Sequence, residues 1–108
     1  MKKVGIHAAS FYLPSIYVDI KDLAIKRDIE YEKLSKGLGL NKMSFPDCDE
    51  DPASFAANAL IKLIDSNNIN PKEIGRIYLG TESAIDSSKP TISYAVEIVE
   101  EILEVSHG

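Results

Sequence analysis

Residues 80–90 read Gly-Thr-Glu-Ser-Ala-Ile-Asp-Ser-Ser-Lys-Pro, a polar stretch between two apolar ones. It follows a short apolar run at residues 74–79 and precedes an amphipathic run at residues 91–105. This order predicts a strand, a loop and a helix, which is an α/β pattern. Loops at the carboxyl ends of buried strands are where α/β proteins place their chemistry. Glu82 is therefore a candidate general base, with a solvated loop carboxylate as the alternative.

Hydrophobic spacing and helix signals predict the other elements. Asp19 can cap a helix over residues 20–27, and a second helix over residues 29–36 would end at Gly37 in a left-handed conformation. Asp51 and Pro52 are typical of a helix start, and the apolar stripe continues to residue 65. The remaining predictions are a strand in residues 4–13, a short extended piece at 42–46, a strand at 74–79 covered on both faces, and a helix over 90–103.

Composition excludes several classes of protein. The chain has 108 residues, of which 44% are hydrophobic and 27% charged, and this balance is typical of a soluble globular domain. The net charge of -5 and the scattered lysines argue against a nucleic-acid surface. No apolar run reaches the roughly 18 residues of a membrane span, and no signal-peptide pattern opens the sequence. A single cysteine and no leader favour a cytoplasmic location.

Four other polar features carry no chemistry in this interpretation. His7 has no ligand-type partner at metal-binding spacing, and His107 is interpreted as a solvated terminal residue. The acidic run at residues 47–51 lacks the length and central glycine of an EF-hand, so we predict no metal site. Cys48 lies within that run with no histidine near it in sequence, which argues against a nucleophile.

The stretch at residues 80–89 resembles the catalytic-glutamate segment of hydroxymethylglutaryl-CoA synthases. Three further stretches resemble that family in the same order: residues 11–19, the Gly-Leu-Gly-Leu turn at 37–40 with Lys42 and Met43, and residues 67–76. The resemblance implies a thiolase-like layered αβ sandwich. Residues 1–108 would form only the opening part of its first half, as an incomplete N-terminal portion of the synthase domain. It also implies a homodimer.

The resemblance assigns Glu82 the role of general acid/base in a Claisen-type condensation of acetyl-CoA with acetoacetyl-CoA. Such a base needs a partly dehydrated site. Thr81 and Ser83 are expected to orient the carboxylate, and Ala84 and Ile85 to exclude water. Loop and helix-start roles are expected for two further charged residues, Asp86 and Lys89.

The segment before the Gly-x-Gly turn contacts coenzyme A in this family. The matching positions are Tyr31, Glu32 and Lys33, and Lys33 is the candidate to meet a CoA phosphate, with a solvated lysine as the alternative. CoA thioesters are the implied ligands, and no metal or other cofactor is implied.

The family's nucleophilic cysteine and catalytic histidine would lie beyond residue 108. The chain alone is therefore expected to be inactive and to fold against the rest of a synthase or a second subunit. Two alternatives stay open: another acyl-condensing enzyme of the thiolase superfamily, and a non-catalytic split subunit or interaction fragment.

Overall fold

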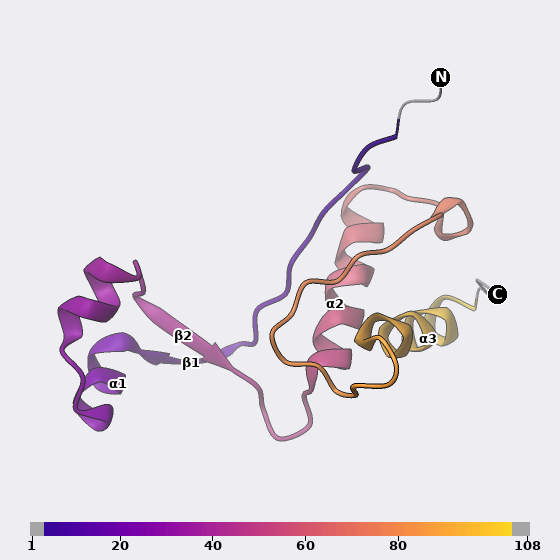
Figure 1. The fold of residues 1–108 in the computed structure, drawn as a ribbon. Helices are drawn as coiled ribbons and strands as arrows, with labels where there is room; N and C mark the ends of the chain where they lie inside the picture. Colours follow the sequence, from indigo (N-terminus) through magenta and orange to yellow (C-terminus); the bar gives the residue numbers. More distant parts are fainter. Residues whose placement is uncertain (1–3, 105–108) are drawn as a thin grey trace. The chain divides into compact units, whose positions relative to one another are not determined.

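In the computed structural model, which describes residues 4–104, the chain divides into two units (Figure 1). One unit comprises residues 13–49 and contains β1, α1, η1 and β2. The other comprises the described parts of residues 1–12 and 50–108, with α2, η2 and α3. Residues 13–49 are the ribbon unit. The other unit is the helical unit, and it contains the loop with Glu82.

The ribbon unit is built on a two-stranded antiparallel sheet. β1 (Ile16–Asp19) pairs with β2 (Lys42–Phe45), and Ile16 stands opposite Phe45 in the register. The prediction of an extended piece at residues 42–46 is confirmed, whereas β1 was not predicted as a strand. Its four residues directly follow Pro14 and Ser15, and the expected strand was placed before that proline.

α1 (Ile20–Arg27) leaves β1 directly and is confirmed as predicted. The Asp19 side chain accepts a hydrogen bond from the Lys21 N–H at 2.9 Å, and this satisfies one of the free N–H groups at the helix start. Ile20 and Ala24 are buried and form the centre of this small unit. The helix ends at Asp28, which adopts a left-handed conformation.

The second helix of the ribbon unit is shorter and wider than expected. Residues 31–32 are α-helical, and η1 (Lys33–Gly37) continues as a π-helix. The prediction of a left-handed Gly37 is wrong, because Gly39 has the positive φ of 69°. Glycine adopts this φ at no steric cost because it has no side chain.

The helical unit is built on two helices, α2 (Pro52–Ser66) and α3 (Thr91–Leu103). Both predictions are confirmed to within one residue at the ends. At the start of α2 the Asp51 carboxylate accepts from the Ser54 N–H at 2.8 Å, and the Ser54 hydroxyl receives the Asp51 N–H at 2.9 Å. This capping box satisfies two N–H groups and typically stabilises a helix by about 1 kcal/mol.

Small residues allow the two helices to approach closely. Ala56, Ala57 and Ala95 are buried between them, and larger side chains complete the cluster: Leu60, Ile64 and Val99. Ala95 is fully buried, so no larger side chain fits there without displacing a neighbour. α3 is therefore held firmly on α2.

Residues 74–79 do not form the expected strand. They run extended beside the helices, and among the described residues no ladder pairs with them (Figure 1). Ile74, Ile77 and Leu79 pack on the α2–α3 cluster, whereas Arg76 and Tyr78 are exposed. The segment is thus covered on one face only. It does not form a strand, because a strand needs backbone hydrogen-bond partners and none lies within the described residues.

Residues 4–13 likewise lack a ladder, so the strand predicted there is wrong for this structure. Side chains hold this segment instead. The Ser10 hydroxyl donates to the Ala59 carbonyl, and the Tyr12 hydroxyl donates to Glu50 at 3.0 Å. This last bond raises the pKa of Tyr12. The segment therefore follows α2 without forming sheet.

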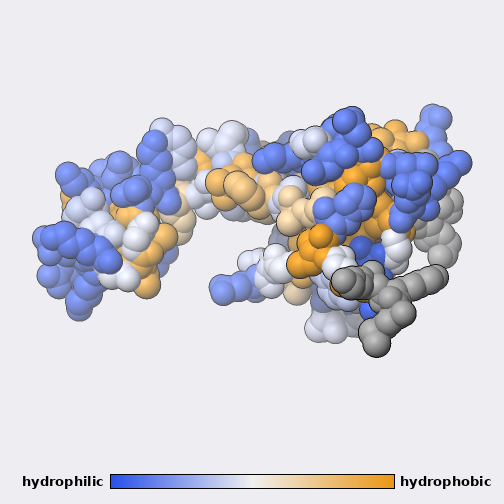
Figure 2. Space-filling model, turned by 90° about the horizontal axis from the view of Figure 1, so that it is seen from above, coloured by the Kyte–Doolittle hydropathy of each residue, from blue (hydrophilic) through white to orange (hydrophobic). Residues whose placement is uncertain are grey.

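Apolar side chains remain at the surface of the helical unit, as the orange areas of Figure 2 show. Ile102 on α3 is 59% exposed, and Ile6 in the N-terminal segment is 90% exposed. None of the helices between residues 4 and 104 has both the length and the hydropathy to span a bilayer.

Candidate active site

The candidate base Glu82 lies on the loop that joins residues 74–79 to α3. Its side chain is exposed, and within residues 4–104 no hydrogen bond or ion pair involves it. The Thr81 hydroxyl accepts the Ser83 N–H at 3.1 Å, so it turns the loop and does not orient Glu82. Ala84 and Ile85 are exposed as well. The expected dry environment is therefore absent around Glu82, because no described element covers this side of the loop.

Asp86 is the most heavily hydrogen-bonded group of the loop. Its Oδ1 accepts the Ser88 N–H at 2.8 Å and the Ser88 hydroxyl at 2.7 Å, and its Oδ2 accepts the Tyr94 hydroxyl at 2.9 Å. The backbone bond from Ser88, followed by the two hydroxyl bonds, lowers the pKa of Asp86 below its usual value. Asp86 is thus a structural carboxylate, which agrees with its expected role in the loop.

Tyr94 on α3 joins this network from the helix. The bond to Asp86 raises the pKa of Tyr94, and desolvation and the nearby carboxylate charges act in the same direction. Lys89 Nζ lies 4.4 Å from the centre of the Tyr94 ring, at cation–π distance. Lys89 therefore packs at the helix start, as expected from the sequence.

Thr91 ties a second point of the loop to α3. It is the one buried polar or charged residue described in the chain, and its hydroxyl accepts the Ile85 N–H at 3.3 Å. Sequence reasoning did not single out Thr91 or Tyr94. Thr91 and Tyr94 are three residues apart on the helix that follows the loop. This spacing predicts that both side chains lie on the same face of the helix.

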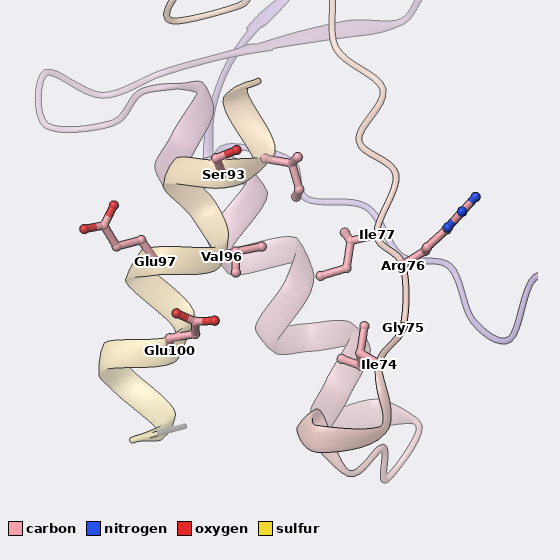
Figure 3. A pocket seen from close by; sticks show the side chains of 9 residues that line it. Ile74, Gly75, Arg76, Ile77, Ser93, Val96, Glu97 and Glu100 are labelled. Atoms are coloured by element: carbon pink, nitrogen blue, oxygen red, sulfur yellow. The ribbon is translucent and has the colours of Figure 1, made fainter. Parts of the chain in front are cut away.

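An open groove of about 610 Å³ lies between residues 74–77 and α3. Ile74, Ile77 and Val96 face one another across it, while Arg76 points away (Figure 3). Glu82 is not among the residues that line it. The groove exists because nothing described packs on this face of the extended segment.

The three candidate CoA-binding residues lie together in the ribbon unit. Tyr31, Glu32 and Lys33 are consecutive and exposed in one helical turn. Lys21 Nζ lies 5.6 Å from the centre of the Tyr31 ring, and the Glu32 carboxylate pairs with Lys36 at 3.6 Å. No contact of the Lys33 side chain appears among residues 4–104, so its ammonium group is available to an anion.

The remaining polar candidates are His7, His107 and the acidic run around Cys48. His7 is exposed, and His107 lies outside the described residues. Side-chain ligand atoms of Asp47, Cys48 and Asp49 approach within 4.8 Å of one another at the exposed turn before α2. The Asp47 carboxylate accepts the Cys48 N–H at 2.7 Å, which is an ordinary turn contact.

A solved structure, MvaS in complex with 3-hydroxy-3-methylglutaryl coenzyme A, matches 99% of this chain with a TM-score of 0.77 and 40% sequence identity, over 25% of its own length. The chain is therefore a mixed α/β portion of a thiolase-like fold. The sequence model described as hydroxymethylglutaryl-coenzyme A synthase N terminal matches residues 1–106. The chain therefore belongs to the hydroxymethylglutaryl-CoA synthase family, and the resemblance drawn from the four motifs is confirmed.

Curated relatives give the same result. The hydroxymethylglutaryl-CoA synthase of Haloferax volcanii is 39% identical over 105 residues, which are 96% of this chain and 24% of the relative. That of Methanococcus vannielii is 36% identical over 99 residues, which are 92% of this chain and 28% of the relative. The chain thus spans about a quarter of the length of these two relatives.

Proposed function

We propose that this chain acts as the opening part of a hydroxymethylglutaryl-CoA synthase, with Glu82 as the general acid/base. The observation that carries the proposal is the loop at residues 80–90, which presents an exposed carboxylate ahead of α3 within the region matched by the family. The function is a Claisen-type condensation of acetyl-CoA with acetoacetyl-CoA, in the pathway to mevalonate and isoprenoids.

The chemistry explains why an exposed carboxylate is useful here. An acetyl group is first transferred from acetyl-CoA to a cysteine supplied by the remainder of the synthase, which forms a thioester and releases CoA. Glu82 then removes a proton from the methyl group, the enolate carbon attacks the ketone of acetoacetyl-CoA, and the alkoxide that forms takes up a proton. Hydrolysis of the thioester releases the product and the cysteine. A base must reach the methyl carbon directly, and burial by the remainder of the enzyme would raise its basicity. No step needs a metal or a redox cofactor.

The partner proposed for the helical unit is the remainder of the synthase, as one chain or a second subunit. The extended residues 74–79 support this, because their backbone lacks ladder partners among the described residues and their outer face is exposed. Unpaired extended segments and apolar patches drive association. The complete enzyme is proposed to be a cytoplasmic homodimer.

A graft tests this function. Residues 1–106 replace the matching stretch of the Methanococcus vannielii relative, and the product is called the grafted synthase below. We expect it to form hydroxymethylglutaryl-CoA from the two thioesters, measured by loss of acetoacetyl-CoA absorbance and by mass. A graft that folds and takes up an acetyl group but forms no product would instead favour the non-catalytic alternative.

The proposed CoA site gives a separate expectation. Lys33 is exposed with no described side-chain contact, so it can serve as a point charge for a CoA phosphate, with Tyr31 and Glu32 beside it. In the grafted synthase, Lys33→Ala should raise KM with little change in kcat, because a remote charge binds ground and transition states alike. Steady-state kinetics measure both.

Lys26→Ala is the matched control for Lys33. Lys26 is an exposed lysine of α1 in the same unit and contacts none of the three candidate residues, so its removal should change KM less. A large fall in kcat for Lys33→Ala with KM unchanged would remove Lys33 from the coenzyme site.

A further inference from the structure

Two residues in the first turns of α3 hold the loop that carries Glu82. Thr91 receives the Ile85 N–H, and Tyr94 donates to Asp86. Ile85 is three residues and Asp86 four residues beyond Glu82, so both contacts fix the backbone just past the candidate base. The loop is otherwise exposed from residue 80 to residue 90 apart from Asp86.

The Thr91 contact is a buried one. Thr91 is 7% exposed, and a hydroxyl in that position is costly to leave without a partner. α3 begins after Pro90, which offers no side-chain cap. The buried hydroxyl is therefore directed at the loop, where it satisfies the Ile85 N–H at 3.3 Å.

The Tyr94 contact is reinforced from both sides. Ser88 holds Oδ1 of Asp86 through its N–H and its hydroxyl, while Tyr94 holds Oδ2. The ammonium group of Lys89 lies over the same tyrosine ring. One tyrosine thus ties a hydrogen-bonded turn of the loop to the helix.

α3 is a firm support for these two contacts. Ala95 and Val99 follow on the same helix and are buried against α2. A loop attached to such a helix is held in one position, whereas an unattached loop samples many conformations. Small displacements matter for proton transfer, since a shift of 1 Å in a catalytic group costs on the order of 10²-fold in rate.

We propose that Thr91 and Tyr94 are positioning residues for Glu82, acting through Ile85 and Asp86. The proposal rests on the proposed function of Glu82. It predicts a defect confined to proton abstraction, because transfer of the acetyl group to the cysteine does not use the Glu82 carboxylate.

Variants that remove one hydroxyl each test the proposal in the grafted synthase. Thr91→Val and Tyr94→Phe keep the size of the side chain and delete the oxygen that contacts the loop. Each should slow condensation and solvent-deuterium exchange of the acetyl methyl group by about 10-fold, within the range that misplacement allows. Acetyl-enzyme formation should stay at the parent rate, and the double variant should approach 10²-fold.

Two controls separate positioning from general damage. Thr91→Ser restores the hydroxyl and should recover the parent rate. Tyr17→Phe deletes the hydroxyl of an exposed tyrosine on β1 that makes no hydrogen bond among the described residues, and it should change nothing. If acetyl-enzyme formation falls together with condensation, the residues serve only the fold and the proposal is overturned.

Amide exchange in the grafted synthase tests the attachment independently of catalysis. Thr91→Val should accelerate exchange of the Ile85 amide, and an unchanged rate would overturn the attachment itself. The grafted synthase then distinguishes the two proposals. If Glu82→Gln strongly impairs condensation while Thr91→Val and Tyr94→Phe do not, only the positioning role fails. If Glu82→Gln has no effect, the proposed function fails and the positioning role with it.

Discussion

Glu82→Gln in the grafted synthase should accumulate the acetyl-enzyme and condense it about 10²–10⁴-fold more slowly than the parent. Glutamine keeps the size and hydrogen-bonding capacity of the side chain but cannot accept the methyl proton. Transfer of the acetyl group to the cysteine needs no such proton removal, so it should continue. Mass spectrometry of the quenched enzyme measures the adduct, and product formation measures the condensation.

A second measurement isolates the same step. Exchange of the acetyl methyl protons with solvent deuterium reports proton abstraction without the second substrate, and it should fall in parallel with condensation. Glu101→Gln makes the identical chemical change at an exposed position of α3 and should leave both rates at the parent value. If Glu82→Gln condenses at near the parent rate, Glu82 is a solvated loop carboxylate and the central assignment is wrong.

The helices could be predicted from the sequence because their signals are local. Asp51, Pro52 and Ser54 form the start of α2 within four residues, and Asp19 caps α1 within three. The apolar faces of α2 and α3 pack against each other, so each helix buries the apolar stripe of the other. Such signals lie within one or two helical turns and do not depend on the rest of the chain.

The strands could not be predicted equally well, because a strand is defined by a partner elsewhere. Residues 74–79 have the apolar character of an interior strand, yet no ladder forms along them within the described residues. β1 is only four residues long and owes its state to β2, 26 positions along the chain from Ile16 to Lys42. Pattern alone does not show whether the partner is present.

The candidate site was predictable in position but not in its supports. The order of apolar run, polar loop and helix placed Glu82 on the loop before α3, as observed, whereas the dry environment expected around it is absent from the described residues. The contacts of Thr91 and Tyr94 depend on how α3 is rotated about its axis when Ala95 packs on α2. That rotation follows from packing, so the contacts of the Thr91 and Tyr94 hydroxyls could not be predicted from the sequence.

The 108-residue chain by itself should take up no acetyl group from acetyl-CoA. Its only cysteine is Cys48, which is exposed at the turn before α2. An acyl-accepting thiol needs a neighbouring base or positive charge to form the thiolate. The side chains that gather around Cys48 are the carboxylates of Asp47 and Asp49. After incubation with acetyl-CoA, the intact mass should therefore remain that of the unmodified chain.

Alkylation supplies the control for that measurement. Iodoacetamide should add a single group at Cys48, because the thiol is exposed, and Cys48→Ser should lose this label. Together these results would show that the thiol is accessible but not activated. The chain would then contribute the base Glu82 while the nucleophile comes from the remainder of the synthase. A stable acetyl adduct on Cys48, absent from Cys48→Ser, would contradict this division, since base and nucleophile would then both reside in these 108 residues.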